Sequence, residues 1–165
     1  MQDAGADWTI VRCTWFSQNF SESYMVDPIR SGELALPVGD MPEPFVDVDD
    51  IADVAVAALT EDGHSGRLYE LTGPRLLTFA EAVAEVAKAS GRPVRFVSIP
   101  MEDFASAVTE AGEPEDVVWL LRYLFTEVMD GRNASLTDGV QQALGREPRD
   151  FADYARDAAA TGVWS

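Results

Sequence analysis

The sequence predicts an α/β fold, and three observations support this prediction. Segments rich in β-branched and aromatic residues alternate with amphipathic helical segments up to residue 100. From residue 101 to residue 165 the apolar periodicity is helical throughout. The chain has 165 residues, 47% hydrophobic and 25% charged, which is typical of one soluble globular domain. We therefore expect a single domain over 1–165, with an α/β part over 1–100 and a helical extension over 101–165.

Five segments of the α/β part are predicted to be strands. WTIVRC (8–13) is β-branched at its centre, as expected for a central strand. The other four are LALPV (34–38), FVDV (45–48), RLYELTG (67–73) and PVRFVSIP (93–100). Because helical segments separate several of these strands, we expect a parallel sheet.

Helices are predicted between these strands. A carboxylate from Asp49 or Asp50 can cap a helix at this corner of the chain. The apolar stripe of that helix comprises Ile51, Val54, Ala55, Ala58 and Leu59. Thr78 and Glu81 stand at capping-box spacing at the start of a second helix, and Gly91 ends it.

The region after residue 100 contains four helical segments, each with a glycine or proline at its boundary: 101–112, 114–131, 135–145 and 150–162. The second is densely apolar and includes Trp119, Tyr123 and Phe125. Packing in the core is the expectation for these side chains, and a lipophilic pocket wall or a dimer face is the alternative.

The charge balance excludes one class of partner. The chain has 29 acidic and 12 basic residues, for a formal net charge of −17. Nucleic acid requires clustered lysine and arginine, so we expect no nucleic-acid partner. No apolar run approaches the length of a membrane span and no leader precedes the first strand, so we expect no membrane association and a cytoplasmic location.

Cysteine and histidine are almost absent. Cys13 is the only cysteine and His64 the only histidine, which leaves too few ligands for a Cys/His zinc site, and we expect no metal. His64 lies in the turn-like sequence EDGHSG, where we expect an exposed and inert side chain. A strand-end cysteine in apolar surroundings is likewise expected to be unreactive.

Three stretches in order carry a family resemblance: WTIVRCTWFSQNF (8–20), GELALPVGDMPEPFVDVDDIADVAVAALT (32–60) and GRLYELTGPRLLTFAEAVAEVAKASGRPVRFVSIP (66–100). Taken together, they resemble the C-terminal half of the NmrA-like family of atypical short-chain dehydrogenases/reductases. The resemblance runs from about residue 5 to residue 164. It implies the later strands of a Rossmann-like parallel sheet, followed by a C-terminal helical substrate-binding subdomain.

The family's dinucleotide loop has no counterpart in this sequence. Neither G-x-G-x-x-G nor G-x-x-G-x-x-G occurs, although such glycines let the backbone approach a pyrophosphate at a helix N-terminus. The resemblance therefore implies a chain that begins near the fifth strand of its relatives. NAD(P) is the cofactor that the family implies, and without a phosphate-binding loop the alternative is no cofactor.

The predicted site lies in the loop after the first strand. In relatives this loop reads like R-P-x-x-F-x-x-N and lines the nicotinamide and substrate end of the cleft. The matching positions hold Arg12, Phe16 and Asn19, with Thr14 and Trp15 between them. Aromatic walls with an amide donor suit a planar polar ring. The alternative is that Trp15 and Phe16 pack against the helices while Asn19 caps the next helix.

Two other features of the sequence bear on catalysis. Asp47, Asp49 and Asp50 could act as acid and base or bind a hard cation, but capping and packing of the strand-to-helix corner is the favoured interpretation. The reductase dyad Tyr-x-x-x-Lys is absent, because Pro28 and Gly73 stand four residues after the tyrosines at 24 and 69. The catalytic residues thus stay unknown.

Three functions remain open. The first is an NAD(P)-dependent oxidoreductase or epimerase-type protein that retains a region for a small organic ligand and is inactive as a reductase in isolation. The second is a non-catalytic regulatory or partner-binding module. The third is a structural remnant whose open sheet edge is covered by a homo-oligomer or a partner protein.

Overall fold

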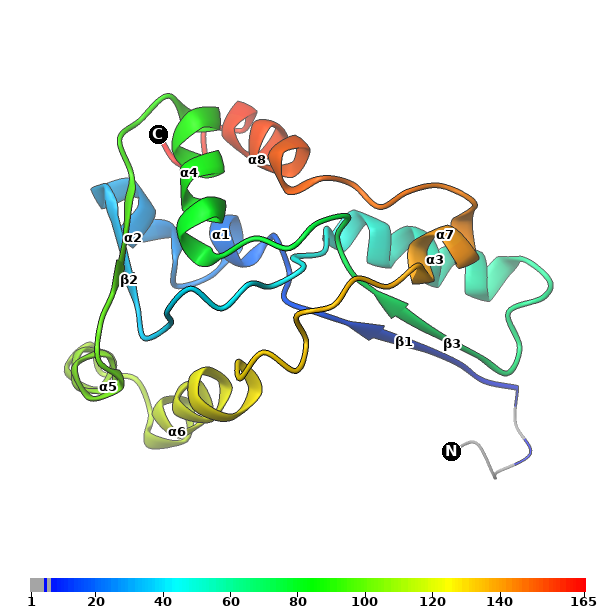
Figure 1. Cartoon of the computed structure of the whole chain (residues 1–165), viewed down its shortest axis with the longest axis horizontal. Helices are drawn as coiled ribbons and strands as arrows, with labels where there is room; N and C mark the ends of the chain where they lie inside the picture. Colours follow the sequence, from blue (N-terminus) through cyan, green and yellow to red (C-terminus); the bar gives the residue numbers. More distant parts are fainter. Residues whose placement is uncertain (1–4, 6) are drawn as a thin grey trace.

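The computed structural model describes Gly5 and residues 7–165. Strands and helices alternate as far as residue 98, and only helices follow (Figure 1). The elements are β1 (Thr9–Cys13), α1 (Asn19–Glu22), α2 (Val26–Ser31), β2 (Glu33–Leu36), α3 (Val48–Thr60), β3 (Arg67–Leu71), α4 (Phe79–Ser90), β4 (Arg95–Ser98), α5 (Met101–Glu110), α6 (Glu115–Tyr123), the π-helix η2 (Leu124–Val128), α7 (Gly139–Leu144) and α8 (Phe151–Ala160). The predicted α/β class is confirmed.

The strands form two short parallel pairs. β1 pairs with β3, from Thr9 opposite Arg67 to Cys13 opposite Leu71. β2 pairs with β4, from Glu33 opposite Arg95 to Leu36 opposite Ser98. Each pair joins strands far apart in the sequence, as parallel pairing requires. The expected Rossmann-like parallel sheet is thus present as two separate pieces.

The predicted strand over FVDV (45–48) is wrong. Val46 makes only an isolated parallel bridge with Phe16, and α3 already begins at Val48. The helix cap is also two or three residues earlier than expected, because the Asp47 carboxylate accepts a hydrogen bond from Asp49 N–H at 3.0 Å. A side-chain cap at Asp47 requires helical backbone immediately after it, which ends the strand.

The expected apolar stripe of α3 is only partly buried. Val54 and Ala57 lie in the core, whereas Leu59 is 85% exposed. Residue spacing fixes which side chains share a helix face, but the width of the buried strip depends on what packs against that face. Leu59 therefore lies on open surface beside β1.

The main hydrophobic core contains residues from both the α/β part and the helical extension. Phe20, Phe45, Phe79 and Phe151 pack with ring centroids 5.1–5.8 Å apart. In Figure 1, α8 lies beside α4, so the last helix covers the helix that follows β3. The predicted capping box of α4 is confirmed, with both bonds between Thr78 and Glu81 present.

The expectation of core packing is wrong for most of α6. No residue of this helix is buried, and Trp119, which is 64% exposed, stacks on Tyr123 at 5.6 Å. Phe125, two residues after the end of α6, is buried in the main core. Within α6, only the partly buried Leu121 packs against that core among the described residues.

Glu43 is the one buried carboxylate of the described residues that lacks a hydrogen-bond partner for either oxygen. Two backbone hydrogen bonds join it to Leu77: Glu43 N–H donates to Leu77 O at 2.9 Å, and Leu77 N–H donates to Glu43 O at 3.0 Å. Its side chain is 0% exposed, and this burial raises the pKa of Glu43 from 4.5 to about 7. The folded protein therefore holds a proton on Glu43 at pH values where the unfolded chain releases it.

Glu43→Gln is expected to make the stability of the protein less dependent on pH. In the wild-type protein, Glu43 contributes fully to the free energy of unfolding below about pH 4.5. This contribution is lost as the pH rises through about 7. Glutamine does not titrate. The free energy of unfolding of Glu43→Gln, relative to that of the wild-type protein, should therefore rise by roughly 2 kcal/mol between pH 5 and pH 8. Urea unfolding at both pH values measures the difference.

Asp40→Asn is the matched control, since Asp40 is an exposed carboxylate a few residues before Glu43. The difference in free energy of unfolding between Asp40→Asn and the wild-type protein should change by less than about 0.5 kcal/mol between pH 5 and pH 8. If the difference in free energy of unfolding between Glu43→Gln and the wild-type protein were also constant from pH 5 to pH 8, the pKa of Glu43 would not be raised.

No helix in the described part of the chain has the length and hydropathy needed to cross a bilayer.

Candidate functional site

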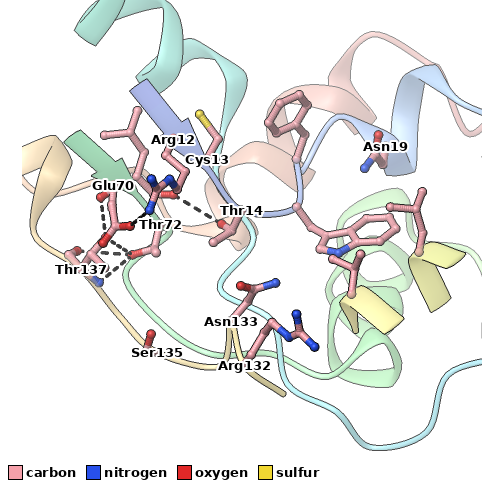
Figure 2. Close-up of a pocket in the computed structure, with 15 residues that line it drawn as sticks. Arg12, Cys13, Thr14, Asn19, Glu70, Thr72, Arg132, Asn133, Ser135 and Thr137 are labelled. Carbon is pink, nitrogen blue, oxygen red and sulfur yellow. Dashed lines mark hydrogen bonds and ion pairs between the residues drawn. The ribbon is translucent and has the colours of Figure 1, made fainter. Parts of the chain in front are cut away.

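A cavity of about 570 Å³ lies at the carboxyl ends of β1 and β3. All five predicted site residues line it: Arg12, Thr14, Trp15, Phe16 and Asn19. The opposite wall comes from the segment after η2 and includes Arg132, Asn133 and Ser135 (Figure 2). Ligands of open α/β sheets bind in the crevice outside the carboxyl ends of the strands, so this cavity is the candidate site.

The loop after β1 is fixed by backbone and hydroxyl contacts. Thr14 Oγ1 donates to Pro44 O at 2.8 Å, and Thr14 N–H donates to Leu71 O at 3.3 Å. Val46 N–H donates to Trp15 O at 2.9 Å, and Ser17 N–H donates to Val46 O at 2.8 Å. The backbone of the loop is therefore held in place before any ligand arrives.

The two aromatic residues of the loop differ in their surroundings. Trp15 stacks on Phe125 with centroids 5.8 Å apart and meets Phe79 edge to face at 5.9 Å. Phe16 is 41% exposed. The packing alternative thus holds for Trp15, whereas the ring of Phe16 has a face available to a ligand.

Asn19 does not cap a helix, which corrects the second half of that alternative. It is the first residue of α1, whose N-terminus has no side-chain cap, and α2 begins after Met25. The side-chain amide of Asn19 has no hydrogen-bond partner among the described residues. It borders the cavity as an available donor and acceptor.

Gln18 has a structural role that the sequence pattern did not reveal. Its Nε2 donates to Asp47 Oδ1 at 2.7 Å, while its Oε1 accepts from Val48 N–H at 2.9 Å. The side chain thereby joins the site loop to the start of α3. No local signal predicts this pairing, because the partners lie about thirty residues apart.

The polar side of the cavity is built across β3. Thr137 Oγ1 donates to Glu70 O at 2.5 Å, and Thr137 N–H donates to Thr72 Oγ1 at 3.1 Å. A Cβ on Gly139 would lie 2.2 Å from Glu70 O, so only glycine allows this segment to approach β3 so closely. Sequence reasoning missed this wall, whose residues follow the predicted loop by more than one hundred positions.

The two arginines of the cavity are both paired. Arg12 bonds to Glu70 at 2.7 Å, and Arg132 binds Asp130 through Nε and Nη2. The Arg132 hydrogen bonds lower the pKa of Asp130 to about 2. With each cation balanced by a carboxylate, the cavity favours an uncharged planar ligand with polar edges over a free anion.

Cys13 and His64 offer no nucleophile or base to this cavity. Burial raises the pKa of the Cys13 thiol, which keeps it protonated at neutral pH. The expectation of an exposed His64 is wrong, because its ring is 8% exposed and its Nδ1 lies 2.8 Å from Tyr69 Oη. A hydroxyl partner five residues along the chain draws the ring inward.

The acidic group at the start of α3 is structural, as favoured from the sequence. Asp47 caps the helix, and Asp49 bonds to Arg149 at 2.8 Å. Asp50 accepts from Arg146 Nη1 at 2.6 Å and from Arg149 N–H at 2.7 Å. The carboxylates of Asp49 and Asp50 thus have partners from the C-terminal segment, whereas that of Asp47 accepts from Gln18 and Asp49 N–H.

The described residues fit one end of a nicotinamide dinucleotide but not its centre. The exposed face of Phe16 and the amide of Asn19 suit the nicotinamide ring. A pyrophosphate requires a glycine-lined loop at a helix N-terminus, and the described helices that follow a strand begin after Gln18, Asp47, Thr78 or Pro100. The described residues therefore provide no phosphate cradle.

Comparisons with known proteins agree with this geometry, although no family model matches the chain. The NAD(P)H azoreductase of Xenophilus azovorans is 37% identical over 160 residues, covering 97% of this chain and 56% of that protein. The triphenylmethane reductase of Citrobacter sp. superposes with a TM-score of 0.80 at 20% identity, over 94% of this chain and 54% of that one. The regulator NmrA, solved with NAD, gives a TM-score of 0.62 at 19% identity, over 98% of this chain and 56% of that one.

The fold and the cavity define a Rossmann-like α/β protein. Its predicted resemblance to the NmrA-like, atypical short-chain dehydrogenase/reductase family is confirmed. The chain spans about half the length of the curated relatives it matches.

Proposed function

We propose that this chain is the substrate-binding part of an NmrA-like, NAD(P)-dependent oxidoreductase that acts in the cytosol. The observation that carries the proposal is the cavity at the carboxyl ends of β1 and β3, which is lined by the partly exposed Phe16, by Asn19 and by the polar residues Asn133 and Ser135. The identity of 37% to an NAD(P)H azoreductase supports reductase chemistry. The balanced charges support a neutral planar substrate, such as an azo compound.

Each residue has a role in this proposal. Phe16 supplies a flat apolar surface for a ring, and Asn19 orients its polar edge. Trp15, fixed between Phe79 and Phe125, excludes water from the floor of the cavity. Asn133 and Ser135 can bond to a carbonyl or nitrogen on the other side of the ligand. When bound, the nicotinamide would supply the hydride.

The isolated chain is expected to bind reduced nicotinamide mononucleotide and NADPH with similar, weak affinity. Both carry the ring for which the cavity is proposed, and the described residues offer no phosphate cradle to the adenosine half of NADPH. Calorimetric titration of the two compounds tests the proposal. Micromolar binding of NADPH with a large preference over the mononucleotide would contradict it, as would no binding of either compound at millimolar concentration.

Phe16→Ala is expected to weaken binding of the mononucleotide about tenfold, because a ring stacked on an aromatic face contributes roughly 0.5–1.5 kcal/mol. Trp119→Ala is the control, since Trp119 is also an exposed ring but does not line the cavity. Fluorescence titration of the reduced mononucleotide compares the two variants with wild type. Equal affinities for all three would remove Phe16 from the site.

A second candidate is a non-catalytic regulatory module. The observation that favours it is the lack of an effective proton donor among the described residues: the sequence has no Tyr-x-x-x-Lys pair, burial raises the pKa of Cys13 and makes its thiol a weak acid, and Tyr69 is engaged with His64. Turnover of an azo compound with NADPH, measured on a preparation that does bind NADPH, separates the candidates. Binding without turnover supports the module, and turnover supports the reductase.

A further inference from the structure

Segment 41–47 connects the two walls of the cavity. It crosses the middle of the molecule on the way from β2 to α3 (Figure 1). At its start, the side chain of Met41 lies against Gly131, and a Cβ added to that glycine would come within 2.9 Å of the Met41 sulfur. Gly131 directly precedes Arg132 and Asn133, which line the opposite wall of the cavity. The start of the segment is therefore in contact with the opposite wall.

The other end of the segment is bonded to the loop after β1, which forms the near wall. Pro44 O accepts from Thr14 Oγ1 at 2.8 Å. Val46 donates its N–H to Trp15 O at 2.9 Å and accepts from Ser17 N–H at 2.8 Å. Movement of the segment would therefore release the backbone of the near wall.

Glu43 places a buried carboxylate inside this segment. Its side chain is 0% exposed, and neither carboxylate oxygen has a hydrogen-bond partner among the described residues. Residues 43–47 are buried without interruption, and Pro42 and Pro44 flank the glutamate. Proline fixes its own φ and confines the residue before it to extended conformations, so the backbone around Glu43 is stiff. For this carboxylate to reach solvent, the segment has to move.

The protonation state of Glu43 determines how stable the buried position is. A buried carboxylate without a partner is far more costly when it is ionised than when it is protonated. Burial accordingly raises the pKa of Glu43 from 4.5 to about 7. The closed segment therefore binds the proton more tightly than an open one, and a rise in pH shifts the equilibrium toward the open state.

The surrounding charges do not compensate an ionised Glu43. The near wall has no charged residue from 14 to 19. Every charged side chain on the other packed segments is bonded to a group other than Glu43 or lies in solvent, so the titration of Glu43 alone sets the pH dependence. These side chains are Asp40 and Asp47 on either side of Glu43, Arg75 and Glu81 on either side of Leu77, and Asp130 and Arg132 on either side of Gly131.

We infer that Glu43 is a pH-sensitive latch for the cavity: protonated and buried, it keeps segment 41–47 packed between the two walls, and loss of the proton favours a state in which the segment moves outward and the near wall is released. The latch acts on the walls themselves, whichever ligand the cavity takes. It differs from a general loss of stability at high pH, because the opening is confined to this segment and the loop bonded to it.

Native-state hydrogen exchange tests the inference without any ligand, so its outcome is independent of the proposed function. The equilibrium constant for opening is measured for the amides of Ser17, Glu43 and Val46 at pH 5.5 and pH 7.5, after correction for intrinsic exchange rates. In the wild-type protein we expect this constant to rise roughly twentyfold over that range, as the shift of the pKa from 4.5 to about 7 requires. Low concentrations of urea should leave the constant unchanged, because movement of a short segment exposes little surface.

Two variants and a control complete the experiment. Glu43→Gln and Glu43→Met keep a side chain of similar length that does not titrate, and both should abolish the rise. Asp40→Asn removes an exposed carboxylate from the same loop and should behave like the wild-type protein.

The inference is wrong if the wild-type protein and the Glu43 variants show the same change with pH, or if Asp40→Asn also abolishes that change. It is equally wrong if the three amides exchange only through an opening that increases steeply with urea, because such an opening is the unfolding of the whole domain.

Discussion

Trp164→Ala is expected to destabilise the protein by about 3–5 kcal/mol. Trp164 is 1% exposed, packs edge to face on Tyr154, and donates from Nε1 to Phe20 O at 2.8 Å. Removing the indole leaves a cavity in the core and an unpaired buried carbonyl. Chemical denaturation measures the loss.

The matched control for this prediction is Trp119→Ala. It removes the same side chain from a site that is 64% exposed, and its effect should stay within about 1 kcal/mol. Trp164→Phe adds a second comparison, because it refills much of the volume but cannot donate to Phe20 O. If Trp164→Ala were as mild as Trp119→Ala, the C-terminal residues would not be part of the core.

Asp50→Ala is expected to cost about 1.5–3 kcal/mol, the range for loss of hydrogen bonds to a charged group, because the partly exposed Arg146 keeps its bond to Asp53. The carboxylate of Asp50 is fully buried and accepts from Arg146 Nη1 and Arg149 N–H. Without it, the amide of Arg149 has no acceptor there. The segment that leads into α8 should then detach from α3, which hydrogen exchange of α8 would detect alongside the fall in the denaturation midpoint.

Asp53→Ala provides the comparison within the same network. Asp53 also bonds to Arg146, at 2.6 Å, but its side chain is about half exposed. Exposed pairs contribute roughly 0–1 kcal/mol, so this variant should remain close to wild type. Similar losses for Asp50→Ala and Asp53→Ala would mean that burial of Asp50 is not what makes its pairing important.

Both large effects concern contacts between the first and last parts of the chain. Arg30 and Arg92 add to them by donating to the carbonyl oxygens of Val163 and Trp164. These contacts position α8 against α4, and the same core holds Trp15 at the floor of the cavity. Loss of the C-terminal contacts should therefore reduce ligand binding as well as stability.

Much of the fold and part of the site could be predicted from the residues alone. The β-branched centre of WTIVRC, the capping box of Thr78 and Glu81, and the stop at Gly91 act within a few residues of themselves, so local patterns report them. The loop from Arg12 to Asn19 was also identified from its sequence, and its five predicted residues border one cavity. Whether they bind a nicotinamide remains a prediction.

Only the tertiary structure decided the remaining features. Local spacing could not show that Trp119 is exposed while Trp164 is buried, that Gln18 joins the site loop to α3, or that Thr137 and Gly139 build the far wall on Glu70. Each depends on residues brought together from distant parts of the chain. Periodicity specifies which side chains share a face, whereas burial, pairing and the sign of a pKa shift depend on what packs against that face.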